Sequence, residues 1–154
     1  MSANSGQPRY QQGLALVETA ICLPLLLFLM LAAGEVTNVF VQHNTLTKAV
    51  RDGARFAAGV SFNHGGKVFD LRPDIITDTK SIVVFGNTSG AGTPALPSFT
   101  VGAVTVTGVA VETVEVKATY AYTGIIGSVL PAFGFGPDTS LGFTLEASVR
   151  MRAL

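Results

Sequence analysis

A 20-residue run, LALVETAICLPLLLFLMLAA, extends from Leu14 to Ala33 and decides the fold of the chain. Only Glu18, Thr19 and Pro24 in this run are not apolar. As an α-helix, the run would be roughly 30 Å long, which matches the hydrocarbon thickness of a bilayer. A helix in the core of a soluble domain presents a polar face, but residues 20–33 contain no charged or amide side chain. We therefore expect a membrane-inserting helix.

A cleaved secretory signal is the main alternative explanation of the same run. Such a signal has an apolar stretch of about 7–15 residues that ends at a small-x-small cleavage site. Here the stretch is longer, and Leu31-Ala32-Ala33 places a bulky residue where a small one is required. A lipoprotein signal also fits poorly, because Ile21 precedes Cys22. Secretion after cleavage near Ala33 is therefore the weaker alternative.

The flanks of the run set its expected orientation. Residues 1–13 form a polar leader in which Arg9 and the amino terminus carry the only positive charges, and the next basic residue is Lys48. Positive charge favours the cytoplasmic side of a span. We therefore expect a cytoplasmic leader, a transmembrane helix over residues 14–34, and an extracytoplasmic location for everything that follows.

The helix is expected to continue beyond the membrane over residues 35–58. Apolar residues recur there at three- and four-residue spacing, which predicts one buried stripe on an amphipathic helix. Gly59 is the expected stop signal. Pro24 should bend the helix, because it lacks the N–H group that would bond to Ala20. The members of the predicted stripe are Val36, Val39, Phe40, His43, Leu46, Val50, Ala54 and Ala57.

Residues 59–154 are expected to form a β-rich extracytoplasmic domain. The clearest alternation lies in residues 109–122, where Val114, Val116 and Ala118 share one face while Glu115 and Lys117 share the other. The other predicted elements are a short helix near residues 70–78 and strands over 81–85, 100–106 and 141–151, with 124–137 left unassigned. The predicted fold class is therefore α+β, with a long N-terminal helix packed against a C-terminal antiparallel sheet.

The composition of the whole chain excludes several classes of protein. Its 154 residues are enough for about one domain, and ten Lys plus Arg balance ten Asp plus Glu. Apolar residues make up 48% of the chain, which is too many for a disordered protein. Without net charge, the chain has no overall electrostatic attraction to nucleic acid. The single Cys22 excludes a disulfide scaffold.

No constellation of residues in the sequence predicts catalysis, a cofactor or a metal ion. His43 and His64 have no Cys or carboxylate at ligand spacing, and no Ser/His/Asp set or pair of acids stands out. We therefore do not expect the chain to be an enzyme.

The most specific motif, QGLALVET at residues 12–19, joins the leader to the apolar run. Gly13 ends the leader, and a single carboxylate, Glu18, follows five positions later. This arrangement resembles a type IV prepilin processing site. In that family a membrane aspartyl peptidase cuts after the glycine at the cytoplasmic face, which would make Leu14 the first mature residue and Glu18 the fifth.

The spacing of Leu14 and Glu18 also has a physical rationale. Cleavage after Gly13 would leave a charged α-amine on Leu14 at the edge of the hydrocarbon layer, one helical turn from Glu18. A carboxylate costs up to about 3 kcal/mol at the centre of a bilayer and less near the interface. An amine about 4 Å away would offset about 4 kcal/mol at an effective dielectric constant near 20. We expect this charge pair, within or between subunits, to set the axial stagger of bundled helices.

Further features of residues 13–58 narrow the resemblance. They are Val17-Glu18, Leu23-Pro24-Leu25, Glu35 shortly after the span, Gln42, and the stretch AVRDGAR at residues 49–55. Together they resemble the TadE-like minor pilins, or pseudopilins, of the tight adherence (Tad/Flp) pilus. The resemblance implies a bacterial inner-membrane subunit with a cytoplasmic N-terminus, which takes part in pilus assembly or priming for adherence and can reach the cell surface within the pilus. The implied partners are a prepilin peptidase, other pilins and minor pilins, the inner-membrane assembly platform and the lipid bilayer, but no nucleic acid.

Two other functions stay open at the level of sequence. One is a permanently anchored, single-pass envelope protein that is never processed and whose external domain binds a partner. The other is a secreted enzyme released by cleavage near Ala33. The N-terminus of the mature chain separates the three hypotheses, since it would be Leu14 for the pilin, Met1 for the anchor and a residue near Gly34 for the enzyme.

Overall fold

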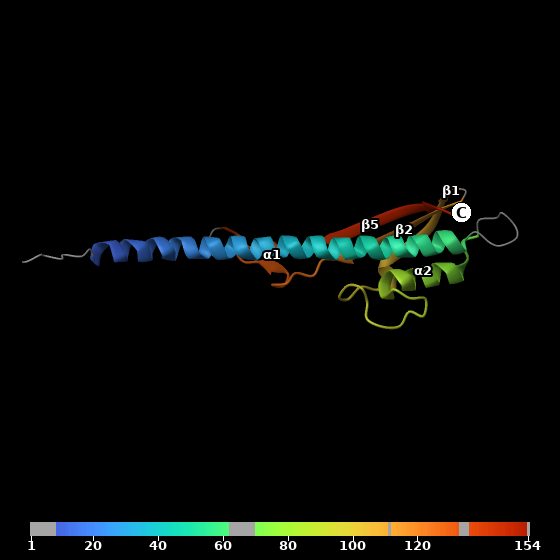
Figure 1. Cartoon of the computed structure of the whole chain (residues 1–154), viewed down its shortest axis with the longest axis horizontal. Helices are drawn as coiled ribbons and strands as arrows, with labels where there is room; N and C mark the ends of the chain where they lie inside the picture. The colour runs from blue at the N-terminus through green and yellow to red at the C-terminus, as the bar shows by residue number, and fades with distance from the viewer. Residues whose placement is uncertain (1–8, 62–69, 111, 133–135, 154) are drawn as a thin grey trace, which may run out of the picture.

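A computed structural model describes residues 9–61, 70–110, 112–132 and 136–153. A helix, α1 (Arg9–Val60), forms the long axis, and a smaller helix and a sheet pack along its C-terminal half (Figure 1). The sequence prediction of an α+β fold with an antiparallel sheet on a long helix is confirmed. The remaining elements are α2 (Pro73–Phe85), the 3₁₀ turn η1 (Val101–Ala103), β1 (Val104–Ala110), β2 (Thr113–Ala121), β3 (Val129–Leu130), β4 (Thr139–Ser140) and β5 (Thr144–Arg152).

The helix α1 is unbroken and contains the whole apolar run. Its segment from Ala15 to Val60 includes one stretch that is long and apolar enough to cross a membrane, and none of the residues in that stretch is buried. The predicted stop at Gly59 is correct to within one residue. Pro24 lies inside α1 without ending it, and the bend expected there stays a prediction.

The main sheet has the strand order β1-β2-β5, with both pairs antiparallel. The expected single strand over residues 109–122 is wrong, because β1 ends at Ala110 and β2 begins at Thr113. The chain reverses there with Glu112 at a φ of 64°, a left-handed conformation that tight turns require. The expected strand 100–106 likewise begins only at Val104, after η1.

The two faces of β2 differ as the alternation predicts. Val114, Val116 and Ala118 are fully buried against the helices, whereas Glu115 and Lys117 lie on the opposite face. On that outer face, the Glu115 carboxylate accepts hydrogen bonds from the Arg150 and Ser148 side chains of β5, which lowers its pKa. The outer face is thus a solvated surface of cross-strand pairs.

The predicted strand at residues 81–85 is wrong, because these residues form the last turns of α2. Pro73 begins this helix and Gly86 ends it in a left-handed conformation with a φ of 75°, its N–H donating to the Ile82 carbonyl. A short apolar run fits a strand or a buried helix equally well by pattern. Burial of Ile75, Thr79 and Val83 at four-residue spacing shows that the helical period governs this segment.

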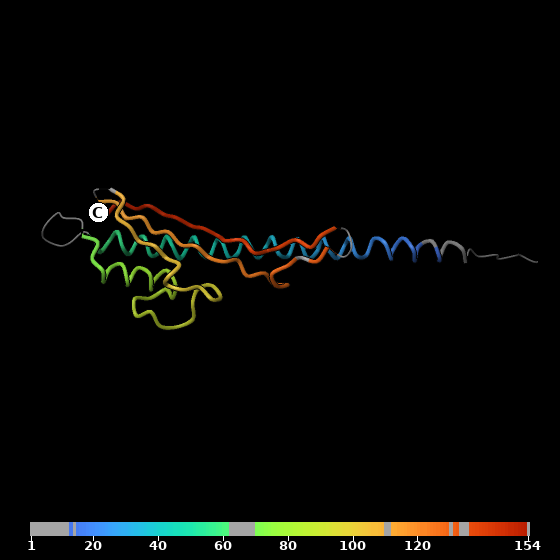
Figure 2. Tube along the Cα trace, turned by 180° about the vertical axis from the view of Figure 1, so that it is seen from behind, coloured from blue at the N-terminus to red at the C-terminus, as the bar shows by residue number. Residues whose placement is uncertain are grey.

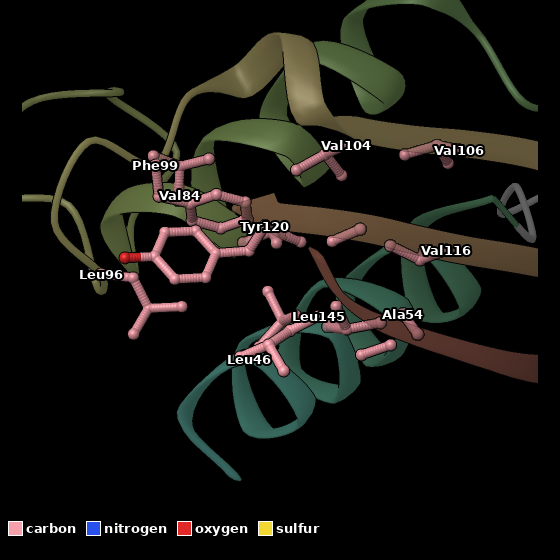
Figure 3. Close-up of a cluster of buried hydrophobic side chains, with 14 of the residues drawn as sticks. Leu46, Ala54, Val84, Leu96, Phe99, Val104, Val106, Val116, Tyr120 and Leu145 are labelled. Carbon is pink, nitrogen blue, oxygen red and sulfur yellow. The ribbon is translucent and has the colours of Figure 1, made fainter. Parts of the chain in front are cut away.

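The hydrophobic core lies between the C-terminal half of α1, α2 and the inner face of the sheet (Figure 3). Leu46, Val50 and Ala54 of α1 are fully buried in it. The N-terminal end of the predicted α1 stripe is wrong, since Val36, Phe40 and His43 are exposed. The buried face instead continues through Gln42 and Glu35, which lie one and about three turns before Leu46 on the same side of the helix.

A second, two-stranded sheet, β3 paired with β4, lies beyond the end of the main sheet. Both views place it beside a more N-terminal part of α1 than the main sheet covers (Figures 1 and 2). β3 falls within the glycine-rich segment 124–137, to which the sequence assigned no structure, and β4 follows that segment.

We predict that Gly53→Ala destabilises the outer domain, by which we mean the core-forming half of α1 with α2 and the main sheet. A methyl group at Gly53 would overlap Val83 Cγ2 and lie 3.4 Å from the Thr79 carbonyl oxygen, so α1 and α2 would have to move apart. Overpacking of this kind costs about 1–3 kcal/mol of unfolding free energy. Gly59→Ala is the matched control, because nothing lies within 4 Å of its added methyl group. Denaturant unfolding in detergent micelles measures both variants, and equal stabilities would contradict the close approach.

Candidate functional site

The predicted processing residues lie on the N-terminal part of α1. Gly13 and Leu14 are both helical, and Gly13 is exposed with nothing within 4 Å of an added methyl group. Glu18 is also exposed and follows Leu14 by one helical turn. The carboxylate is therefore accessible to a neighbouring helix, but its pairing with an amine on Leu14 stays a prediction.

A second polar site, which we call the junction cluster, lies where α1 leaves the apolar run. It consists of Glu35, Asn38 and Gln42 on α1 together with Tyr122, Thr123 and Ile126, which follow β2. Glu35 is only 3% exposed, although it comes just two positions after the end of the apolar run. A buried carboxylate is unfavourable unless hydrogen-bond donors surround it.

The segment that follows β2 supplies the donors for Glu35. The Tyr122 hydroxyl donates to Glu35 Oε2, and the Ile126 backbone N–H donates to Glu35 Oε1 at 2.9 Å. Each carboxylate oxygen thus has its own donor, one from a side chain and one from the backbone. Asn38 Nδ2 donates to the Tyr122 oxygen at 3.0 Å, which orients the hydroxyl proton toward Glu35.

The amide side chains of Gln42 and Asn38 form hydrogen bonds with the backbone of Thr123. Gln42 Nε2 donates to the Thr123 carbonyl at 2.8 Å, and the Thr123 N–H donates to Gln42 Oε1 at 3.4 Å. Asn38 Nδ2 donates to the same carbonyl at 3.1 Å. The side chains of α1 therefore satisfy both backbone groups of Thr123.

The surroundings of Tyr122 are apolar except for this network. Its ring stacks on Phe143 with the ring centroids 4.8 Å apart. Burial raises the pKa of Tyr122, and the hydrogen bond to Glu35 raises it further, while donation from Asn38 acts in the opposite direction. The phenol therefore stays protonated and keeps its role as a donor.

Gly124 permits the close approach of this segment to α1. A methyl group there would overlap the Gly127 carbonyl oxygen and come within 3.4 Å of Glu35 Oε2. The chain can therefore turn next to the carboxylate only because this residue has no side chain.

Sequence reasoning noted Glu35 and Gln42 but did not predict the junction cluster. It placed Val36, Phe40 and His43 on the buried face, because apolar residues normally occupy it. The polar residues 35, 38 and 42 also recur at three- and four-residue spacing. This spacing of polar residues could have indicated a polar contact on one face of the helix. It did not reveal which later segment supplies the partners.

Comparison with known proteins gives a family match for the N-terminal part of the chain. Residues 13–55 match the family model described as TadE-like protein. The chain carries a TadE-like N-terminal segment. No match is found among curated proteins or among solved structures.

The TadE-like segment includes both polar sites of α1. It begins at Gly13 and contains Glu18, Glu35 and Gln42, together with Gly53 at the contact with α2. Tyr122 and Thr123, which complete the junction cluster, lie outside the match. Within the described residues, no group of three or more His, Cys, Asp or Glu side chains could hold a metal ion.

We predict that Glu35→Ala destabilises the outer domain by about 1–3 kcal/mol, because the Ile126 N–H and the Tyr122 hydroxyl lose their buried acceptor. Glu146→Ala is the control, since Glu146 forms an exposed ion pair with Lys117 and its loss should cost less than about 1 kcal/mol. Denaturant unfolding of the two variants beside the unmodified chain measures the difference. Equal losses would show that Glu35 stabilises no more than a surface carboxylate.

We also predict a dependence of stability on alkaline pH that arises from Tyr122. The unfolded phenol ionises near pH 10, whereas the folded phenol ionises at a higher pH because its pKa is raised. This contribution is therefore fully present below about pH 10 and is lost as the pH rises through the folded-state pKa. Unfolding free energies measured from about pH 8 to 11 should fall more steeply for the unmodified chain than for Tyr122→Phe. Parallel curves would contradict the assignment.

Proposed function

We propose that the chain is a minor pilin or pseudopilin of a Tad/Flp-type pilus, with a structural rather than an enzymatic role. The observation that carries the proposal is a TadE-like segment on an exposed apolar helix that continues without a break into a folded α+β domain. In this role the chain is inserted in the bacterial inner membrane with its leader in the cytoplasm. It takes part in pilus assembly or in priming for adherence.

Processing after Gly13 by a prepilin peptidase is the first step of this proposal. Cleavage frees the α-amine of Leu14, and Glu18 is the first carboxylate along the mature chain. The exposure of Glu18 supports a pairing with the amine of a neighbouring subunit as well as with its own. Such pairs fix the axial stagger of helices whose apolar side chains supply the packing.

The junction cluster links this axial stagger to the position of the outer domain outside the membrane. Hydrogen bonds from Tyr122, Thr123 and Ile126 hold the outer domain at a fixed height on α1. An axial position set at Glu18 is therefore passed along the helix to the outer domain. The partners of that domain in this proposal are other pilins, minor pilins and the inner-membrane assembly platform.

A permanently anchored envelope protein is the second candidate, and one observation favours it. The bond between Gly13 and Leu14 lies within α1, which begins at Arg9. A peptidase would have to unwind this first part of the helix to reach the bond. In this alternative the leader stays attached, and the outer domain binds a partner in the envelope.

We predict that the chain extracted from its native membrane begins at Leu14, whereas Gly13→Ala keeps the leader. Intact mass spectrometry of both proteins measures the cleavage directly. Gly34→Ala is a matched control on the same helix, since nothing lies within 4 Å of its added methyl group. An uncut chain in the native host would favour the anchored protein, and a start near Gly34 would indicate secretion.

We further predict that Glu18→Ala is cleaved but is no longer incorporated into filaments, because the amine of Leu14 loses its acidic counterpart. Immunodetection of the subunit in sheared pili, beside its amount in the membrane, measures incorporation. Glu146→Ala, which removes an exposed carboxylate of the outer domain, should be incorporated normally. Normal incorporation of Glu18→Ala would contradict the pairing.

A further inference from the structure

We propose that the segment around the β3–β4 hairpin is a second membrane contact, which rests in the outer leaflet beside α1 at the boundary between headgroups and acyl chains. We call it the apolar lobe and define it as residues 124–132 and 136–143. The inference requires that α1 spans the membrane, but it requires neither cleavage after Gly13 nor assembly of a filament.

The junction cluster fixes the position of the apolar lobe along α1. Near its first residues, the lobe is held to Glu35 by the Ile126 N–H, which donates to the carboxylate. At its last residue, the Phe143 carbonyl accepts from the Tyr122 N–H at 2.9 Å. Between these two points it lies beside the part of α1 that precedes Glu35, as both views show (Figures 1 and 2). The lobe therefore lies on the membrane side of the junction.

The burial of α1 agrees with this position. Phe28, Leu31 and Ala32 are half-buried, and they lie on the same face of the helix as Glu35. Phe28 precedes Glu35 by seven residues, or roughly 10 Å along the axis. This length is similar to the depth of about 5–10 Å at which interfacial segments rest in a membrane.

The surface of the lobe has the chemistry of a lipid contact. Ile125 is 70% exposed, and Ile126, Val129 and Phe143 are each at least 40% exposed. The sequence from residue 124 to 143 contains a single charged residue, Asp138, and no Lys or Arg. Several large exposed apolar side chains on one short, nearly uncharged segment are typical of an interaction surface.

Several polar groups of the lobe are paired within the protein. Val129 and Leu130 pair with Ser140 and Thr139, and the Leu141 N–H donates to the Ser128 carbonyl at 2.8 Å. The Asp138 carboxylate accepts from the Ala132 N–H at 2.9 Å. Backbone groups that are paired in this way can enter the lipid interface at low cost.

The distribution of charge along the molecule indicates lipid as the occupant. Among Asp, Glu, Lys and Arg, residues 14–47 and 122–143 contain only Glu18, Glu35 and Asp138. The cross-strand ion pairs, such as Lys117 with Glu146, begin beyond the junction. The lobe thus continues the uncharged surface of the span, so the layer that covers the span also covers the lobe.

The absence of Trp from the sequence allows a direct test with the full chain. Three variants each introduce one Trp at a well-exposed apolar position: Ile125→Trp in the lobe, Leu29→Trp in the span and Val60→Trp at the far end of α1. Val60 lies roughly 37 Å beyond Glu35 along the helix axis and so serves as the aqueous control. Each variant is reconstituted in phosphatidylcholine–phosphatidylglycerol vesicles with or without lipids brominated near the headgroup, and circular dichroism checks its fold.

The proposal expects bromine to quench the indole fluorescence of the lobe variant, Ile125→Trp, and of the span variant, Leu29→Trp, at least two-fold more strongly than that of the control, Val60→Trp. Dilution of the protein in excess lipid should leave this pattern unchanged. Quenching of the span variant without quenching of the lobe variant would overturn the proposal while leaving the span intact. Quenching of neither would overturn both.

Contact of the lobe with a second copy of the chain gives a different signal in the same experiment. The emission of the lobe variant would then be shifted to the blue without being quenched, and it would return to the red on dilution in lipid. That result would assign the lobe to a protein interface and would also overturn the proposal.

Discussion

The buried carboxylate of Glu35 is the constraint around which the rest of the structure is organised. It lies where α1 leaves its apolar run, between an exposed apolar stretch of the helix and the buried core. Its two oxygens need donors, and the Tyr122 hydroxyl and the Ile126 N–H supply them. Because an unpaired buried carboxylate is costly, the position of the outer domain along α1 is restricted to the one that brings these donors to Glu35.

This constraint lets one helix serve two environments. Over residues 20–33, α1 is apolar on all sides and most of its large side chains are exposed. After Gln42 only one face is apolar, and it is buried by α2 and the sheet. The polar residues between these two regions bind the chain that leaves β2. The apolar lobe then extends back along α1, so its uncharged surface adjoins that of the span.

Several features could be predicted from particular residues. The apolar run from Leu14 to Ala33 predicted the helix, and the alternation of Val114 and Val116 with Glu115 predicted the half-buried strand. The run at residues 81–85 was assigned wrongly, because five apolar or small residues fit either period and the partner helix decides between them. The α1 stripe was wrong at Val36 and Phe40, because a buried polar face cannot be recognised without its partners.

The sequence by itself determined the elements whose physics is local: the length and apolar character of α1, its TadE-like segment, and the alternation in β2. Only the tertiary structure decided that Glu35, Asn38 and Gln42 are buried, that residues 81–85 are helical, and that the lobe lies beside the span. The physical reason is that each of these features depends on contacts between residues that are far apart in the sequence, such as Gly53 with Val83 and Glu35 with Ile126. A periodic pattern shows which face of a single helix or strand is buried. The hydrogen bond from Tyr122 to Glu35, by contrast, depends on where two separate segments meet.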